Sequence, residues 1–165
     1  MNTPTRRGHT LAETMLVIAL SALGLTLALP QWGAPLRRMR VDATAEALRA
    51  ALQLARTAAL ARAAPVVVCG SADGRNCSGD WSRGWIVLPP APAPPLLVHA
   101  APPPRVTLRA TRGLAEGVRF TAEGWARQAE GMLQFGHFTV CSGVDGRDVV
   151  LAPGGRVRVL QRRCA

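Results

Sequence analysis

The longest apolar run of the chain lies between Leu11 and Leu29, and its interruptions include Glu13, Thr14 and Ser21. A transmembrane helix needs about 20 such residues, so the run predicts a membrane-spanning helix. An acidic side chain inside hydrocarbon is costly and persists where it has a partner or a function. A signal anchor explains the apolar run but not Glu13, although the dipole of a helix favours a carboxylate in its first turn.

A second periodicity begins after Pro30. Apolar residues recur there every three or four positions, which is the spacing of one face of an α-helix. They are Val41, Ala45, Leu48, Leu52, Ala55 and Ala59. Pro65 cannot continue a helix, so this helix is expected to end by Ala64. Residues 9–29 and 30–64 are therefore predicted to form the membrane-spanning and amphipathic halves of one helical spine, kinked near Pro30.

The remainder of the chain, residues 65–165, alternates short β-like runs with clusters of turn-forming residues. The predicted strands are Val66–Cys69, Trp85–Leu88, Leu96–Ala100, Val106–Arg109, Val118–Phe120, Met132–Phe135, Phe138–Ser142, Asp148–Leu151 and Arg156–Leu160. Regularly spaced short strands favour antiparallel sheets packed as a sandwich-like head. The predicted fold class is thus α+β, with a long N-terminal helical spine packed on a β-rich head. His137, which follows a glycine, is expected to lie in a turn.

Arginine dominates the charge of the chain. All 20 basic residues are Arg, against 10 acidic residues, which gives a formal net charge of +10 and a pI near 11.5. Such a surface attracts polyanions, whether nucleic acid or acidic lipid. An Arg-rich composition explains the bias equally well without any ligand, so charge alone does not choose a function.

The four cysteines all follow the apolar run and allow three disulfide pairings. Proximity in sequence favours Cys69 with Cys77 and Cys141 with Cys164. Two disulfides indicate an oxidising compartment such as the periplasm. Zinc binding is the alternative, and the absence of a Cys-x-x-Cys pair makes it the weaker one.

Catalytic and metal-binding patterns are missing from the sequence. No pair of carboxylates, no Ser/His/Asp set and no metal-ligand spacing stands out. No nucleotide-binding glycine motif occurs either. We therefore expect a protein that is not an enzyme and that has no cofactor or metal.

The N-terminal residues Arg6-Arg7-Gly8, followed by His9-Thr10-Leu11-Ala12-Glu13, resemble the class III leader of type IV pilins and pseudopilins. The resemblance implies that residues 1–8 are a leader and that a prepilin peptidase cuts between Gly8 and His9. It also implies N-methylation of His9, where the family usually has Phe, and pairing of Glu13 with the α-amino group of a neighbouring subunit. A member of this superfamily is a single-pass protein of the bacterial inner membrane with its C-terminal head in the periplasm, and its partners are other pilin-type subunits.

Two further stretches narrow the resemblance to the GspH/FimT family of minor pilins and pseudopilins. One is CGSADGRNCSGDWSRGWIVL, a cysteine-closed loop followed by Trp-Ser-x-Gly-Trp entering a strand. The other is Gly155-Arg156-x-Arg158, which resembles the terminal Gly-Arg-x-Arg of the DNA-uptake branch.

Strand alternation predicts where the C-terminal arginines point. Arg156, Arg158 and Arg162 are expected on one face of the last strand, with Arg163 assisting, while Val157 and Val159 face the core. Arginine pairs bidentately with phosphate, so this face is a candidate DNA-binding site. The alternatives are a solvated basic strand and a type II secretion pseudopilin that does not bind DNA.

Overall fold

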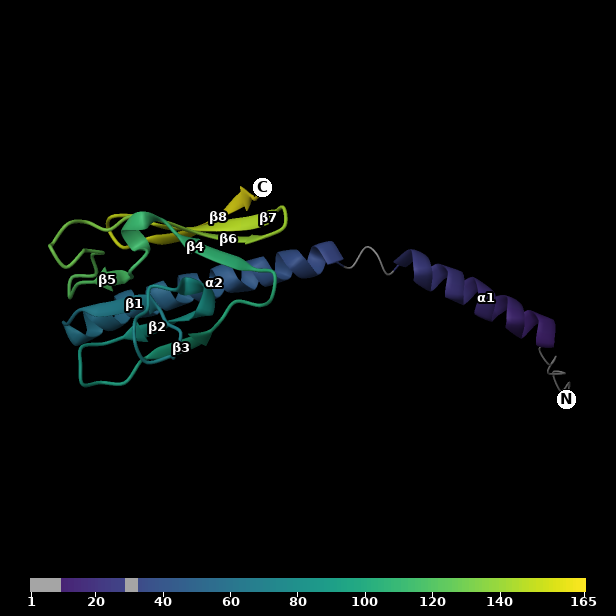
Figure 1. The fold of residues 1–165 in the computed structure, drawn as a ribbon, viewed down its shortest axis with the longest axis horizontal. Helices are drawn as coiled ribbons and strands as arrows, with labels where there is room; N and C mark the ends of the chain where they lie inside the picture. The colour runs from purple at the N-terminus through teal and green to yellow at the C-terminus, as the bar shows by residue number, and fades with distance from the viewer. Residues whose placement is uncertain (1–9, 29–32) are drawn as a thin grey trace, which may run out of the picture. The chain divides into compact units, whose positions relative to one another are not determined.

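A computed structural model describes residues 10–28 and 33–165 of the chain (Figure 1). These residues fall into two compact units that divide between Leu36 and Arg37. The leader 1–8, the expected cleavage site at Gly8 and His9, and the expected kink near Pro30 lie outside the described residues.

The first unit contains helix α1 (Leu11–Ala28). It begins at Leu11 because Thr10 caps it: the Thr10 hydroxyl accepts a hydrogen bond from the Glu13 N–H at 3.4 Å. Thr10 and Glu13 have the spacing of a capping box, and Glu13 lies in the first turn, where the helix dipole favours a negative charge. Over residues 10–28 and 33–165, no helix combines the length and the apolar character needed to cross a membrane.

Helix α2 (Gly33–Arg62) contains the amphipathic stretch that the sequence predicted. Pro35 is accommodated because it lies in the first turn, where its missing N–H would have no partner within the helix. The buried face contains every apolar position that the sequence periodicity selected, and consists of Val41, Thr44, Ala45, Leu48, Ala51, Leu52, Ala55, Ala58 and Ala59. The helix ends two residues before the expected limit at Ala64.

Two four-stranded antiparallel sheets make up the head (Figure 1). The first has the order β3-β2-β1-β5 and the second β4-β6-β7-β8. The strands are β1 (Val66–Gly70), β2 (Gly84–Leu88), β3 (Leu97–Ala100), β4 (Thr107–Ala110), β5 (Val118–Phe120), β6 (Gly136–Ser142), β7 (Asp145–Leu151) and β8 (Val157–Arg163). Two short 3-10 helices, η2 (Trp81–Arg83) and η3 (Arg112–Leu114), lie between strands. The α+β prediction is confirmed.

One hydrophobic core joins α2 to both sheets. The small side chains of α2 let it approach the strands, and the large side chains Trp85, Phe120 and Phe138 fill the space between them. Trp81, on η2, meets Phe138 of the second sheet edge to face, with ring centroids 4.7 Å apart. The aromatic residues therefore connect the two sheets, although the chain has few of them.

Two local predictions are wrong. Met132–Phe135 is not a strand: only Leu133 pairs there, in an isolated bridge with Arg127, and the side chains of Met132 and Phe135 are exposed. A short apolar run does not distinguish a strand from an exposed loop. His137 lies inside β6 rather than in a turn. Gly136, the residue before it, allows the Thr111 side chain to pack closely against β6, because a Cβ at this position would collide with the Thr111 hydroxyl.

Candidate functional site

The C-terminal strand β8 pairs with β7 at the edge of the second sheet (Figure 1). Because directly opposite residues of antiparallel strands point to the same side, the register defines an outer face for this sheet. On it lie Thr107 and Arg109 of β4, His137, Thr139 and Cys141 of β6, Gly146, Asp148 and Val150 of β7, and Arg158, Leu160 and Arg162 of β8. Val157 and Val159 lie on the opposite face, and Val157 is buried.

The strand register shows on which face of the sheet the predicted arginines of β8 lie. Arg158 and Arg162 are exposed and share the outer face of the sheet. Arg156 is also exposed but precedes the strand, next to the turn at Gly154 and Gly155. Arg163 is opposite Asp145 and therefore starts from the other face. The predicted alternation is thus present for two arginines, and the other two lie at the ends of the strand.

Arg162 is held by an acidic partner on the neighbouring strand. Its Nη1 lies 2.9 Å from Oδ2 of Asp148, and Oδ1 of Asp148 accepts a hydrogen bond of 2.8 Å from the Thr139 hydroxyl. The Asp148 side chain is 18% exposed and that of Arg162 is 43% exposed. Asp148 therefore places Arg162 across β7, toward the middle of the sheet.

An open groove of about 540 Å³ runs along this face. It brings Arg162 and Arg163 together with Arg109, which comes from β4 more than fifty residues earlier in the chain. The rest of its lining is Thr107, Ala110, Thr111, His137, Thr139, Cys141, Cys164 and Ala165. Sequence reasoning assigned no role to Arg109. The alternation of polar Thr107 and Arg109 around apolar Leu108 was a signal in the sequence that Arg109 faces outward.

The Cys141–Cys164 disulfide, with a Cα–Cα distance of 6.1 Å, closes one end of the groove. Cys141 is opposite Gly146 of β7, and a Cβ on Gly146 would collide with Sγ of Cys164. The disulfide therefore crosses over β7 and needs a glycine beneath it. It fixes the last residues of the chain beside the arginines.

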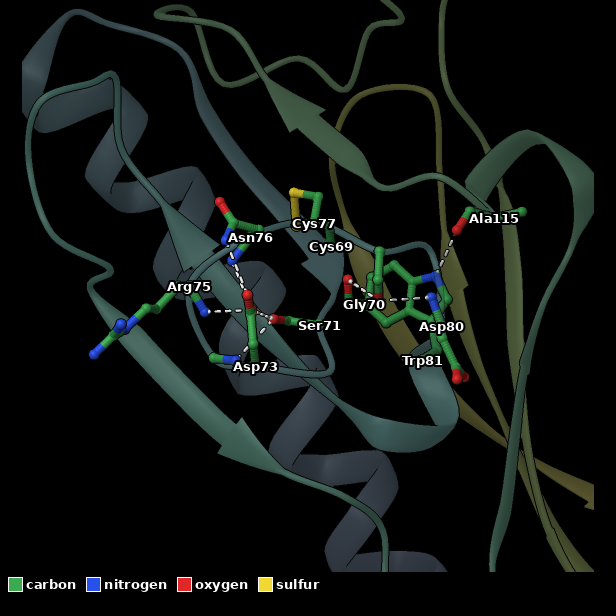
Figure 2. Close-up of a disulfide and its surroundings, with 12 residues drawn as sticks. Cys69, Gly70, Ser71, Asp73, Arg75, Asn76, Cys77, Asp80, Trp81 and Ala115 are labelled. Atoms are coloured by element: carbon green, nitrogen blue, oxygen red, sulfur yellow. Dashed lines mark hydrogen bonds between the residues drawn. A yellow bond between two sulfur atoms is a disulfide. The ribbon is translucent and has the colours of Figure 1, made fainter.

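The second disulfide, Cys69–Cys77, has a Cα–Cα distance of 5.5 Å and closes a polar loop (Figure 2). Asp73 organises this loop: its Oδ1 accepts hydrogen bonds of 2.8 Å from the N–H groups of both Arg75 and Asn76. These bonds, the one from Asn76 first, hold the pKa of the Asp73 carboxyl well below its ordinary value. Both disulfides are the pairs that proximity in sequence favoured.

The Trp-Ser-x-Gly-Trp stretch leaves this loop through η2 (Figure 2). Asp80 caps η2 and accepts a 2.6 Å hydrogen bond from the Ser82 hydroxyl, which, with the Ser82 N–H, lowers the pKa of Asp80. The Trp81 indole N–H donates to the Ala115 carbonyl at 2.8 Å. The stretch therefore has a structural role, because it anchors the loop to the core.

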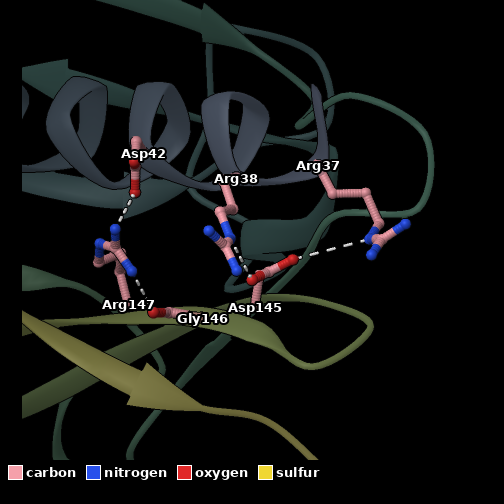
Figure 3. Close-up of polar contacts among 6 residues, drawn as sticks. All are labelled: Arg37, Arg38, Asp42, Asp145, Gly146 and Arg147. Carbon is pink, nitrogen blue, oxygen red and sulfur yellow. Dashed lines mark hydrogen bonds and ion pairs between the residues drawn. The ribbon is translucent and has the colours of Figure 1, made fainter. Parts of the chain in front are cut away.

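Helix α2 and strand β7 are joined by ion pairs (Figure 3). Asp145 accepts a 3.0 Å hydrogen bond from Nε of Arg38 and lies 3.7 Å from Nε of Arg37. One helical turn along, Arg147 pairs with Asp42 at 2.8 Å. These arginines bind the helix to the sheet, so they are engaged within the head.

Glu13, the predicted assembly residue, lies on α1 and so belongs to the other unit. Within the described residues, no group of three or more His, Cys, Asp or Glu side chains could hold a metal ion. The described part of the chain thus presents two candidate functional elements: an apolar N-terminal helix and a basic outer face on the second sheet.

Comparison with known proteins identifies the family of the head. Residues 44–155 match the model of the family described as Type II transport protein GspH. A crystal structure of the type IV minor pilin FimU of Pseudomonas aeruginosa (strain PAO1) is similar with a TM-score of 0.61 and 24% sequence identity, over 74% of this chain and 90% of that one. A second crystal form gives a TM-score of 0.57 at 24% identity, over 72% and 91% of the two chains. At this identity the likeness shows the fold alone. No curated protein matches the chain in sequence. Since the family model covers well over half of the chain, the protein belongs to the GspH family of pilin-like proteins.

Proposed function

We propose that the protein is a non-catalytic minor pilin or pseudopilin subunit, which assembles with other pilin-type subunits through α1. The observation that carries this proposal is the exposure of large apolar side chains around α1 in the single chain. The consecutive residues Met15, Leu16 and Val17, which point about 100° apart around the helix, are 66%, 60% and 58% exposed. A helix that is apolar on all sides needs an apolar environment. Lipid before assembly and the packed helices of neighbouring subunits after it both provide one.

Glu13 makes the contact between subunits specific. Packed helices exclude water, so the carboxylate is stable there only with a cationic partner. The α-amino group that leader removal creates at His9 of a neighbouring subunit is such a partner. A prepilin peptidase, the inner membrane and a periplasmic location follow from the leader resemblance. Two disulfides fit the oxidising periplasm.

Crosslinking in the native membrane tests this function. A photo-crosslinking amino acid at Leu16 should yield products with other pilin-type subunits, and Glu13→Ala should reduce them strongly. Ser21→Ala is the matched control, because the Ser21 hydroxyl donates a hydrogen bond to the Val17 carbonyl within the same helix. Equal yields in the two variants, or no protein products at all, would contradict the proposal.

DNA binding is a second candidate function. The observation that favours it is the exposure of Arg158 and Arg162 on one strand face, next to the groove that Arg163 also lines. With Arg156 at the start of the strand, these side chains would contact phosphates, and such binding ignores sequence and weakens steeply with salt. It would equip the subunit to capture DNA for uptake.

Fluorescence anisotropy with the full chain in detergent tests DNA binding. Replacing Arg156 and Arg158 with Gln should weaken binding more than replacing Arg62 and Arg75, two exposed arginines on α2 and in the Cys69–Cys77 loop. Both double variants change the net charge equally. No binding by the wild type even at low salt would favour a type II secretion pseudopilin without DNA binding.

A further inference from the structure

We infer that the phosphate-contacting surface runs across the second sheet, from Arg162 on β8 to Arg109 on β4, that Asp148 positions Arg162 and restrains it, and that the surface fits duplex DNA. The inference rests on the proposed DNA binding and specifies its site and ligand. It differs from an arginine ladder along β8, because it assigns a role to a distant strand.

The register sets the distance between the two arginines. β4 and β8 are separated by β6 and β7, so with a strand spacing of about 4.8 Å their backbones lie roughly 14 Å apart. A B-DNA major groove is about 12 Å wide. Flexible side chains rooted at Arg109 and Arg162 can therefore reach phosphates on the two sides of that groove. Arg163 lines the same groove of the protein from the end of β8.

The side chains of this face favour phosphate over bases. Proteins that bind single strands typically stack bases on aromatic side chains. The described outer face has Thr, Arg, His, Cys, Asp, Val and Leu side chains, with neither Phe nor Trp among them. Phe138, Trp81 and Trp85 are buried in the core instead. Contacts limited to phosphate gain most from the higher charge density of a duplex.

Asp148 occupies the place of a phosphate. Its carboxylate is bonded to both Thr139 and Arg162, so a phosphate that approaches Arg162 must replace one charged acceptor with another. Asp148→Asn keeps the shape of the side chain but removes this competition. Arg162 then meets the phosphate without first giving up the Asp148 carboxylate, so the affinity rises while the number of phosphate contacts stays the same.

The test measures how the affinity for a short fluorescein-labelled duplex depends on salt, using the full chain in detergent. Arg109→Gln and Arg162→Gln should each reduce the magnitude of the slope of log affinity against log salt by about one. Asp148→Asn should raise the affinity at a given salt concentration and leave this slope nearly unchanged. Arg62→Gln and Glu130→Gln are matched controls, since both residues are exposed and lie off the outer face. The duplex should bind at least as tightly as its separate strands.

The other outcomes contradict either this inference or the proposed DNA binding itself. If the wild type binds but Arg109→Gln behaves like Arg62→Gln, the surface does not cross the sheet and the inference fails while DNA binding stands. A single strand that binds much more tightly than the duplex also overturns the inference. If the wild type binds neither nucleic acid at low salt, DNA binding itself is wrong. Circular dichroism and Arg109→Lys, which keeps the charge and should keep most of the affinity, separate lost contacts from lost folding.

Discussion

Gly146→Ala should destabilise the protein because of the disulfide above it. Gly146 lies on β7 with the Cys141–Cys164 disulfide crossing over it, so an added methyl group collides with Sγ of Cys164. The same methyl lies 3.2 Å from the Val140 carbonyl oxygen and 3.3 Å from that of Arg162. Ordinary van der Waals distances cannot be recovered unless the disulfide or the strand moves.

The expected size of the effect follows from two opposing contributions. Forcing a methyl group into a packed site costs about 1–3 kcal/mol. Gly→Ala also lowers the conformational entropy of the unfolded chain, which stabilises the folded protein by about 0.4–1 kcal/mol. The free energy of unfolding should therefore fall by about 1–2 kcal/mol. In a Cys141→Ala, Cys164→Ala background the main collision is absent, and Gly146→Ala should change stability by less than about 0.5 kcal/mol. Loss of the disulfide, whose cysteines are 23 positions apart, itself costs about 3 kcal/mol on the chain-entropy account.

Urea unfolding of the full chain in a non-ionic detergent, followed by tryptophan fluorescence, measures both effects. Gly113→Ala is the control, because the nearest atom to its added Cβ is 3.7 Å away, an ordinary contact. An equal loss for Gly146→Ala with and without the disulfide would refute the reasoning, since the collision with sulfur would then not be its cause.

Two further changes test the polar contacts of the head. Asp145→Asn should lower the free energy of unfolding by about 1–3 kcal/mol, because the largely buried Asp145 carboxylate pairs with both Arg37 and Arg38. Glu46, which pairs with a neighbouring arginine on the exposed side of α2, is the comparison. Glu46→Gln should lower the free energy of unfolding by less than about 0.5 kcal/mol in the same urea titration. Because the pKa of Asp73 is depressed from 3.8, its stabilisation is present above that pH and is lost as the pH falls toward the folded-state pKa. The difference in stability between the wild type and Asp73→Asn should shrink below about pH 4, and a constant difference down to pH 2 would contradict this.

The main elements of the fold were predictable because their patterns are local. The three-to-four-residue spacing on α2 matches its buried face, and β5 has the predicted bounds. The disulfides followed from proximity in sequence. Met132–Phe135 failed because its apolar side chains are exposed, and no local pattern distinguishes an exposed apolar loop from a short strand.

The candidate site was predictable only along its own strand. Alternation placed Arg158 and Arg162 together, since a strand has a side-chain period of two. The Asp148 partner and the approach of Arg109 depend on the register between strands that are far apart in sequence. Gly146 likewise has no local signature, because its requirement arises from a disulfide whose other end is Cys164.

The most direct test of a filament subunit is the mass of its N-terminus in the native membrane. The proposal predicts a chain that begins at His9, because a prepilin peptidase removes residues 1–8, and it predicts that a bulky replacement of Gly8 leaves the leader in place. A chain that retains Met1 in the wild type, or one that is cut beyond Leu29 and so lacks α1, would contradict the account.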